Sequence, residues 1–226
     1  MWVPHGEFFQ PRQKVFTALL SHADAEGDLD WVVAGRLHHR PCPPAHRRGP
    51  SKGAPAGEPD DHAIGRSRGG LTIKVHLTAD SRCRPLAFVL TPGQAGDAPA
   101  FPAITARLRA PRPLGRPRIT PDVVLADKAY SSRAIRTHLR RRGIRAVIPQ
   151  PADQAAHRER RGSRGGGPPA LDRDAYKQRN TVERCINKLK QWRGLASRYD
   201  KTATIYLAGL HLAGLHLPAI LIWSAT

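Results

Sequence analysis

The sequence predicts an α/β fold in which a mixed sheet carries helices on its faces. Short apolar segments of strand-like length occur at 71–77, 85–90, 122–127 and 145–149. Helical patterns lie between and after them, at 98–109, 131–142 and 172–192. Strands that alternate with helices are typical of a sheet between helical layers, and 226 residues can bury one sizeable core.

The chain before the first of these strands divides into two segments. Residues 1–33 contain a short helical pattern around Phe16 and Leu19, and we interpret them as a remnant N-terminal helical segment. Residues 34–59 are rich in Pro, Arg, His and Gly with almost no apolar periodicity, which predicts a disordered linker. Residues 60–226 then form the folded domain. Within it, the basic, glycine-rich residues 151–170 predict a long loop.

The C-terminal segment requires a choice between a membrane span and a core helix. Residues 205–223 are mostly apolar and just long enough to cross a bilayer. They also contain His211, His216 and Pro218, and nothing else in the chain suggests a membrane. We therefore expect a buried C-terminal helix and no membrane partner.

The charge balance predicts a polyanionic partner. Lys and Arg number 37 against 18 Asp and Glu, which gives a net charge of +19. Aromatic residues make up only 6%, too few for a base-stacking platform, so double-stranded DNA is the first candidate. A merely soluble basic surface is the alternative. Three cysteines without metal-ligand spacing and no signal-peptide pattern favour a cytoplasmic location. With DNA as the partner, we expect the protein to be associated with the nucleoid.

The helix expected at 172–192 places a carboxylate between cations. At about 100° per residue, its side chains Tyr176, Arg179, Glu183 and Lys190 fall within about 60° of one another. An apolar strip lies beside them, so one flank of the helix packs and the next presents Glu183. The alternative is an amphipathic surface helix with an i,i+4 Arg–Glu pair worth a few tenths of a kcal/mol.

A second carboxylate follows a buried strand. Asp127 comes directly after the apolar run at 123–126, and open α/β sheets place their sites at such strand ends. A turn or cap residue is the alternative interpretation. Carboxylates from a strand end and a helix can together hold Mg²⁺ (or Mn²⁺), which prefers hard oxygen ligands. Such a site normally needs a third acidic ligand.

These residues resemble a known family. The spacing Tyr176-x2-Arg179-x3-Glu183-x6-Lys190 resembles the Y-(2)-R-(3)-E-(6)-K signature of the DDE transposases of bacterial insertion sequences. Residues 123–149 resemble the family's segment around its second catalytic aspartate, and residues 65–77 resemble the stretch that leads into its second strand. The resemblance covers about residues 60–226.

The resemblance implies an RNase H-like fold, a divalent metal ion, and DNA strand cleavage and strand transfer at insertion-sequence ends. The implied partners are terminal inverted repeats and target DNA, together with a second copy of the chain in a synaptic complex. Asp127 and Glu183 are then the second and third members of the catalytic triad and the metal ligands. The implied DNA contacts are Arg179 and Lys190 at phosphates, Tyr176 in positioning, and Lys128 and Tyr130 beside Asp127.

The first aspartate of the family has no counterpart at its expected place. Asp60, Asp61 and Asp80 do not lie on a first apolar strand. Allowed codons for residues 35–49, read one base later, give V-D-S-T-I-V-R-A-H-Q-H-T-A-G, which resembles the family's first-aspartate strand. The Asp codon then straddles the codons of Arg36 and Leu37. We therefore expect a frameshifted linker and a disrupted first strand.

Cleavage by this chain is expected to be impaired as a consequence. Two other functions stay open at this stage. The first is a catalytically dead transposase remnant that binds DNA, which would lack nicking activity with Mg²⁺ or Mn²⁺. The second is a basic RNA-associated protein, which would bind structured RNA and be indifferent to inverted-repeat ends.

Overall fold

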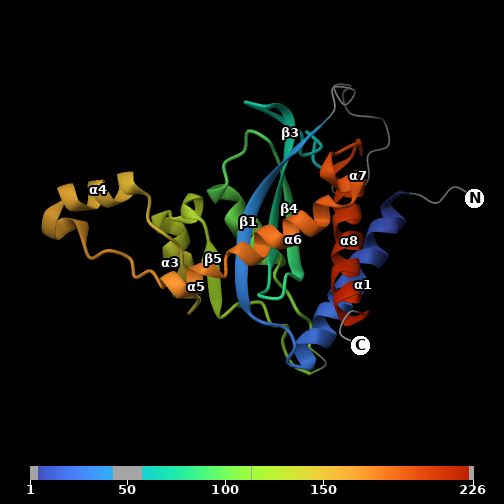
Figure 1. Ribbon diagram of the computed structural model, residues 1–226, viewed down its shortest axis with the longest axis horizontal. Coiled ribbons are helices and arrows are strands. Elements are labelled where there is room, and N and C mark those ends of the chain that lie inside the picture. Colours follow the sequence, from blue (N-terminus) through green and yellow to red (C-terminus); the bar gives the residue numbers. More distant parts are fainter. Residues whose placement is uncertain (1–4, 43–57, 113, 224–226) are drawn as a thin grey trace, which may run out of the picture.

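The computed structural model describes residues 5–42, 58–112 and 114–223, and within them the strands form one six-stranded mixed sheet (Figure 1). The strand order is β2-β3-β1-β5-β6, and β4 also pairs with β3. The bounds are β1 (Val32–Pro41), β2 (Gly65–Ser67), β3 (Gly70–Ala79), β4 (Pro85–Pro92), β5 (Val123–Ala126) and β6 (Arg145–Val147).

The strand directions define the fold class. Strand β3 runs antiparallel to β1, β2 and β4, whereas β5 runs parallel to both β1 and β6. An antiparallel set joined through β1 to a parallel pair is the arrangement of an RNase H-like sheet, so the expected fold class is confirmed.

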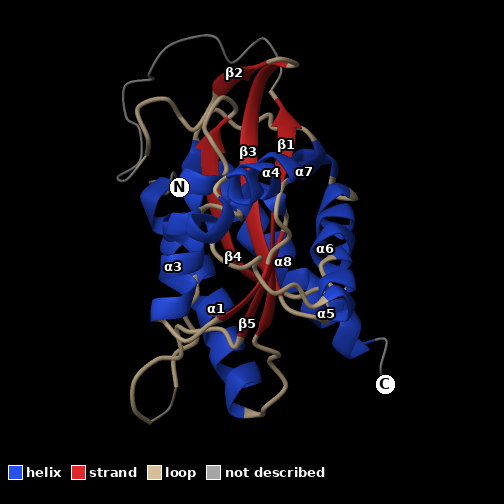
Figure 2. Cartoon of the chain, turned by 90° about the vertical axis from the view of Figure 1, so that its left-hand side faces the viewer, coloured by secondary structure: helices blue, strands red, loops and turns tan. Residues whose placement is uncertain are grey.

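Helices cover both faces of the sheet. On one face, α6 (Asn180–Lys190) and α8 (Ala203–Trp223) pack on apolar side chains of β1, β3 and β5, and α1 (His5–Ala25) packs against α8. On the other face lie α2 (Phe101–Arg107) and α3 (Arg133–Arg141). Figure 2 shows the strands between α3 on one side and α5 (Arg173–Lys177) with α6 on the other. Among the described helices, none is long and apolar enough to span a membrane.

The linker expected over residues 34–59 is wrong for residues 34–42. Residues 34–41 lie in β1, at the centre of the sheet, where they pair with β3 from Ala34↔Ala79 to Pro41↔Thr72. Main-chain groups make these hydrogen bonds, so a basic, Pro-containing composition does not prevent them. The first strand is therefore intact, and a domain boundary at residue 33 would cut through it. Residues 43–57 lie outside the described residues.

The unusual composition of β1 affects its side chains instead. Alternate residues of a strand face the same side of a sheet, so Arg36, His38 and Arg40 share the face that α6 covers. The central strand of the fold thus presents three basic groups to a helix, where an apolar face would be typical.

Two further expectations need correction. Residues 151–170, expected as a loop, contain α4 (Ala152–Arg160) and the 3-10 turn η4 (Gly162–Gly165). Good helix formers such as Ala, Gln, Glu and Arg explain the helix, and its lack of buried residues explains why no apolar pattern announced it. Figure 1 shows α4 projecting away from the sheet. The single helix expected at 172–192 is divided into α5 and α6, followed by α7 (Arg193–Ala196).

Candidate functional site

An open hollow of about 370 Å³ lies where the carboxyl end of β5 meets α5 and α6. It brings together residues from four parts of the chain that are far apart in sequence. The lining residues are Arg36, Asp127, Lys128, Ala129, Pro149, Tyr176, Arg179 and Glu183. Five of the seven residues singled out from the sequence therefore share one hollow, and the two carboxylates are among them.

Asp127 stands directly after β5, as its position in the sequence predicts. Its carboxylate accepts a hydrogen bond from the Ala129 amide at 2.9 Å and caps the 3-10 turn η3 (Lys128–Tyr130). This bond fixes the orientation of the carboxylate at the edge of the hollow. Lys128 follows it and is exposed to solvent.

Glu183 lies in the first turn of α6 and pairs with two arginines. Its Oε1 accepts hydrogen bonds from Arg36 and from Arg179, the latter at 3.3 Å. The Arg179 guanidinium also lies 5.1 Å from the centroid of the Tyr176 ring, a cation–π distance. Tyr176 and Glu183 thus hold Arg179 in place, and the i,i+4 pair is present at the rim of the hollow.

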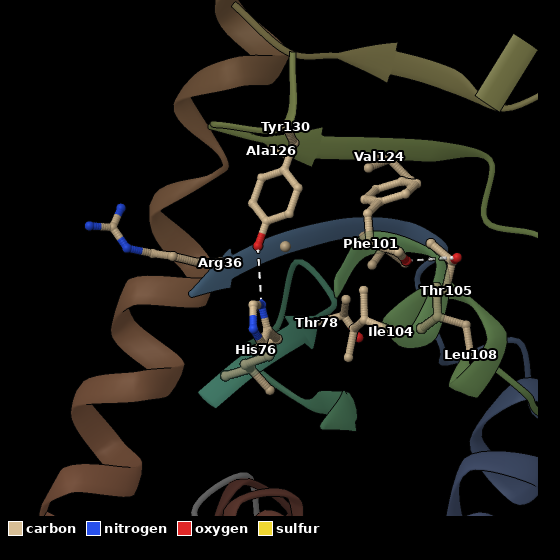
Figure 3. Close-up of a pocket in the computed structure, with 13 residues that line it drawn as sticks. Arg36, His76, Thr78, Phe101, Ile104, Thr105, Leu108, Val124, Ala126 and Tyr130 are labelled. Atoms are coloured by element: carbon tan, nitrogen blue, oxygen red, sulfur yellow. Dashed lines mark hydrogen bonds between the residues drawn. The ribbon is translucent and has the colours of Figure 1, made fainter. Parts of the chain in front are cut away.

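Arg36 is the charged residue of the hollow that was not singled out from the sequence. Figure 3 shows its side chain extending from β1 toward a helix and away from the pocket in which Tyr130 meets His76. It fell within the segment interpreted as a linker, so no role was given to it. The strand-like spacing of Arg36, His38 and Arg40 was the signal that could have identified it.

Lys190 does not line the hollow but joins a basic seam beneath α6. We use that name for Arg36, His38 and Arg40 of β1 with Lys190 of α6. Burial lowers the pKa of Lys190, and the nearby Arg40 and Arg36 lower it further. Burial likewise lowers the pKa of His38 to about 4, with Arg40 and Lys190 adding to the effect. The seam is therefore a region of like-charge repulsion, and Glu183 pairs with its Arg36.

Tyr130 lies beneath the surface rather than on it. Only 4% of the residue is exposed, and its ring packs 6.0 Å from that of Phe101. Its hydroxyl is 3.4 Å from Nδ1 of His76 (Figure 3), and burial raises the pKa of Tyr130. This position suits a residue that supports η3, and it does not favour the expected DNA contact.

The other aspartates considered from the sequence serve structural roles or lie at turns. Asp80 is fully buried and accepts hydrogen bonds from Arg84 and from main-chain amides. Asp61 accepts a bond from the Ala63 amide, and Asp60 lies in an exposed turn. None of them lines the hollow, so none adds a third carboxylate to it.

The residues of the hollow do not fit a divalent metal ion. Mg²⁺ requires near-octahedral oxygen coordination, which in proteins rests on carboxylates. Here Glu183 is engaged by two guanidinium groups, and Arg36 contributes a positive charge where a further ligand is needed. Among the described residues, no group of three or more His, Cys, Asp or Glu is placed to hold a metal ion.

Comparisons with known proteins give consistent relatives. The family model described as the transposase DDE domain matches residues 44–216, so the match begins after β1 ends. A Brucella ovis protein, assigned as the transposase for insertion sequence element IS6501, is 32% identical over 137 residues. That alignment covers 61% of this chain and 90% of the relative.

Two solved structures of Mos1 transposase are also similar in outline. They are the paired-end complex with the left transposon end, at 16% identity and a TM-score of 0.35, and the catalytic domain, at 15% and 0.33. Each likeness covers 96% of this chain, with 63% of the first structure and 95% of the second. At these scores we draw neither a site nor a function from them.

Proposed function

The chain belongs to the family of DDE transposases, and we propose that within this family it binds the terminal inverted repeats of an insertion sequence without cutting them. One observation carries the proposal. Three cations, Arg36, Arg179 and Lys128, share a single open hollow with the two carboxylates Asp127 and Glu183. The hollow is therefore equipped to hold a phosphate and poorly equipped to break its ester bonds.

The arrangement of charges supports phosphate binding. Three positive groups against two negative groups leave one positive charge in the hollow, and the basic seam adjoins it. Arg179 presents a planar fork of donors that matches phosphate geometry, and Tyr176 with Glu183 keeps the fork oriented. Lys128 adds an exposed point charge beside it. The net charge of +19 attracts duplex DNA to the molecule as a whole.

Under our proposal, this chain is impaired in the DNA cleavage and strand transfer that the family resemblance implies. Asp127 and Glu183 are the residues we assign to that chemistry, with Mg²⁺ or Mn²⁺ as the ion the family resemblance implies. Two carboxylates, one of them engaged by arginines, do not fix a metal ion and a nucleophile together. Displacing a reacting group by about 1 Å can reduce a rate by roughly 10²-fold.

We further propose the setting in which the chain acts. Inverted repeats come in pairs, so a homodimer that holds two ends in a synaptic complex is the simplest assembly. Chromosomal and element DNA in the bacterial cytoplasm supply the partner. On α3, Arg133, Arg140 and Arg141 are exposed and extend the basic surface, whereas Arg136 is engaged by the carbonyls of Ser131 and Ile148.

Filter binding over a salt series tests the DNA-binding part of the proposal. The probes are a duplex carrying the element's inverted repeat, a shuffled duplex and a structured RNA, all in EDTA. We expect the inverted repeat to bind most tightly, with log K falling linearly as log[salt] rises. No binding of duplex at low salt would remove the proposal, and tighter binding of RNA would favour an RNA-associated protein.

Incubation of the same inverted-repeat duplex with Mg²⁺ or Mn²⁺ tests the second part. We expect no nicked product from the unaltered chain. Robust nicking that disappears in Asp127→Asn and Glu183→Gln would show that the hollow is an active cleavage site.

A further inference from the structure

We infer that Arg36 occupies the place of a metal ligand, so that a guanidinium ion replaces the divalent cation in this chain. The inference rests on the proposed function only in taking this hollow as the site where DNA is held.

The register of the sheet places residue 36 beside residue 127. Strands β1 and β5 are parallel neighbours, and Gly35 is the register partner of Ala126. Continuing this register by one residue places Arg36 beside Asp127, which directly follows β5 at the hollow. Both line the hollow.

Helix α6 supplies the third residue of the set, Glu183. It packs across β1 and β3, and it brings Glu183 within hydrogen-bonding distance of Arg36. Positions 36, 127 and 183 therefore converge from a central strand, a strand end and a facing helix. Rigid elements hold all three positions, which is the geometry that a ligand set requires.

The chemistry of position 36 excludes a metal ion. A guanidinium is always protonated and carries only donors, so it cannot ligate a cation. It also repels a divalent ion at the short distances that the hollow allows. Because Arg36 and Arg179 both donate to Oε1 of Glu183, that oxygen is already engaged.

The guanidinium also performs part of what a bound ion would do for the fold. It neutralises Glu183 and ties α6 to β1 without any added ion. The positive charge that faces DNA is therefore permanent, so DNA binding by this chain is insensitive to EDTA.

Manganese binding tests the inference directly, measured on the full chain as loss of the electron-paramagnetic-resonance signal of free Mn²⁺. The variants are the unaltered chain, Arg36→Asp, Arg36→Gln and the double variant Arg36→Asp with Glu183→Gln. Arg36→Gln is the matched control because it removes the cation without adding a charged carboxylate. We expect only Arg36→Asp to bind Mn²⁺ stoichiometrically. The Mn²⁺ affinity of Arg36→Asp should exceed that of Arg36→Gln by about tenfold or more. Residues that only hydrogen-bond to metal ligands already change metal affinity by about 10–100-fold, and a direct ligand should matter at least as much.

Each outcome decides the inference. Stoichiometric Mn²⁺ binding by the unaltered chain, lost in Asp127→Asn, overturns it, and that measurement needs no variant at position 36. Equal binding by Arg36→Asp and Arg36→Gln, both folded by circular dichroism, also overturns it. If Arg36→Asp does not fold, Arg36→Glu serves the same comparison. Failure of the unaltered chain to bind inverted-repeat DNA in EDTA would instead remove the proposed function and leave the metal result standing.

Discussion

Two of the sites where arginine meets carboxylate in this fold differ in burial. In the turn between β3 and β4, Asp80 is fully buried and accepts bonds from Nε of Arg84 at 2.6 Å and from the Arg84 amide at 2.8 Å. In the hollow beside α6, the side chain of Glu183 remains 37% exposed, and those of Arg36 and Arg179 remain 32% and 20% exposed. We call the first the buried pair and the second the open site.

The difference separates a structural role from a binding role. At the buried pair, both oxygens of the Asp80 carboxylate accept hydrogen bonds from the protein itself. Neither oxygen is therefore available to a ligand. At the open site, cations outnumber carboxylates and face solvent across a hollow. Burial and saturation therefore identify the carboxylate that holds the fold, whereas exposure and excess positive charge identify the carboxylate that faces a partner.

The largest expected effect is on stability at the buried pair. Asp80→Ala leaves Nε of Arg84 and two main-chain amides without their acceptor, whereas Asp28 still pairs with the Arg84 guanidinium. We therefore expect a loss of about 3 kcal/mol in the free energy of unfolding, the lower end for a broken buried pair. Asp127→Ala, at the open site, removes only a local cap and should cost about 1 kcal/mol. Urea denaturation measures both. Equal losses would remove the distinction between the two regions.

The pH dependence of stability offers a second test of how burial affects a charged group, because His76 is buried. Burial lowers the pKa of His76 to about 4 against its ordinary 6.5, outweighing the carboxylate of Asp97. Because the unfolded chain then binds more protons, stability present above pH 6.5 is lost as the pH falls toward 4, by up to about 3 kcal/mol.

Replacing the histidine tests this account of acid sensitivity. His76→Gln should flatten the fall of the free energy of unfolding between pH 6.5 and 4, followed by urea denaturation at each pH. His157→Gln, on the exposed surface of α4, is the control and should leave the fall unchanged. An unchanged pH dependence in His76→Gln would show that other groups govern the acid response.

DNA affinity should respond at the open site and not at the buried pair. Arg179→Gln removes one phosphate-binding cation and should lower the salt slope of binding by about 1. Glu183→Gln removes a negative charge beside the phosphate and should raise affinity several-fold in EDTA. Arg82→Gln is the matched control, since Arg82 is an exposed arginine that pairs with Asp28 beside the buried pair. A fall in affinity for Glu183→Gln would mean that the carboxylate itself helps to bind DNA.

The smallest expected effect concerns an ion pair that is more exposed than the buried pair or the open site. Lys177 and Asp174 on α5 are paired at 2.7 Å, with side chains 78% and 90% exposed. Lys177→Ala should change the free energy of unfolding by a few tenths of a kcal/mol, as solvent-exposed pairs do. Urea denaturation provides the measurement. A loss comparable with that of Asp80→Ala would show that burial does not rank these pairs.

The sequence predicted the positions of the residues around the hollow better than it predicted the first strand. Helical spacing placed Arg179 and Glu183 on one strip, and the apolar run before Asp127 placed it at a strand end. Both patterns are local, so they can be recognised without the tertiary fold. Short-range side-chain bonds of the same local kind cap α3 at Ser132 and α5 at Asp172.

The segment around Arg36 was mispredicted because composition does not report main-chain pairing. β1 receives its hydrogen bonds from β3 and β5, which are distant in sequence, and those neighbours order it despite its basic side chains. The alternative reading frame remains a prediction. It places an Asp codon across the codons of Arg36 and Leu37, and the nucleotide sequence across codons 30–55 would test it.

Photo-crosslinking tests the central claim that the hollow is where DNA is held. A benzoylphenylalanine replaces Ala129, which lines the hollow, or Arg82, beside the buried pair, and each protein is irradiated with inverted-repeat duplex in EDTA. We predict a crosslink from position 129 that competes away with excess inverted-repeat duplex, and none from position 82. A crosslink from position 82 with none from position 129 would contradict the account.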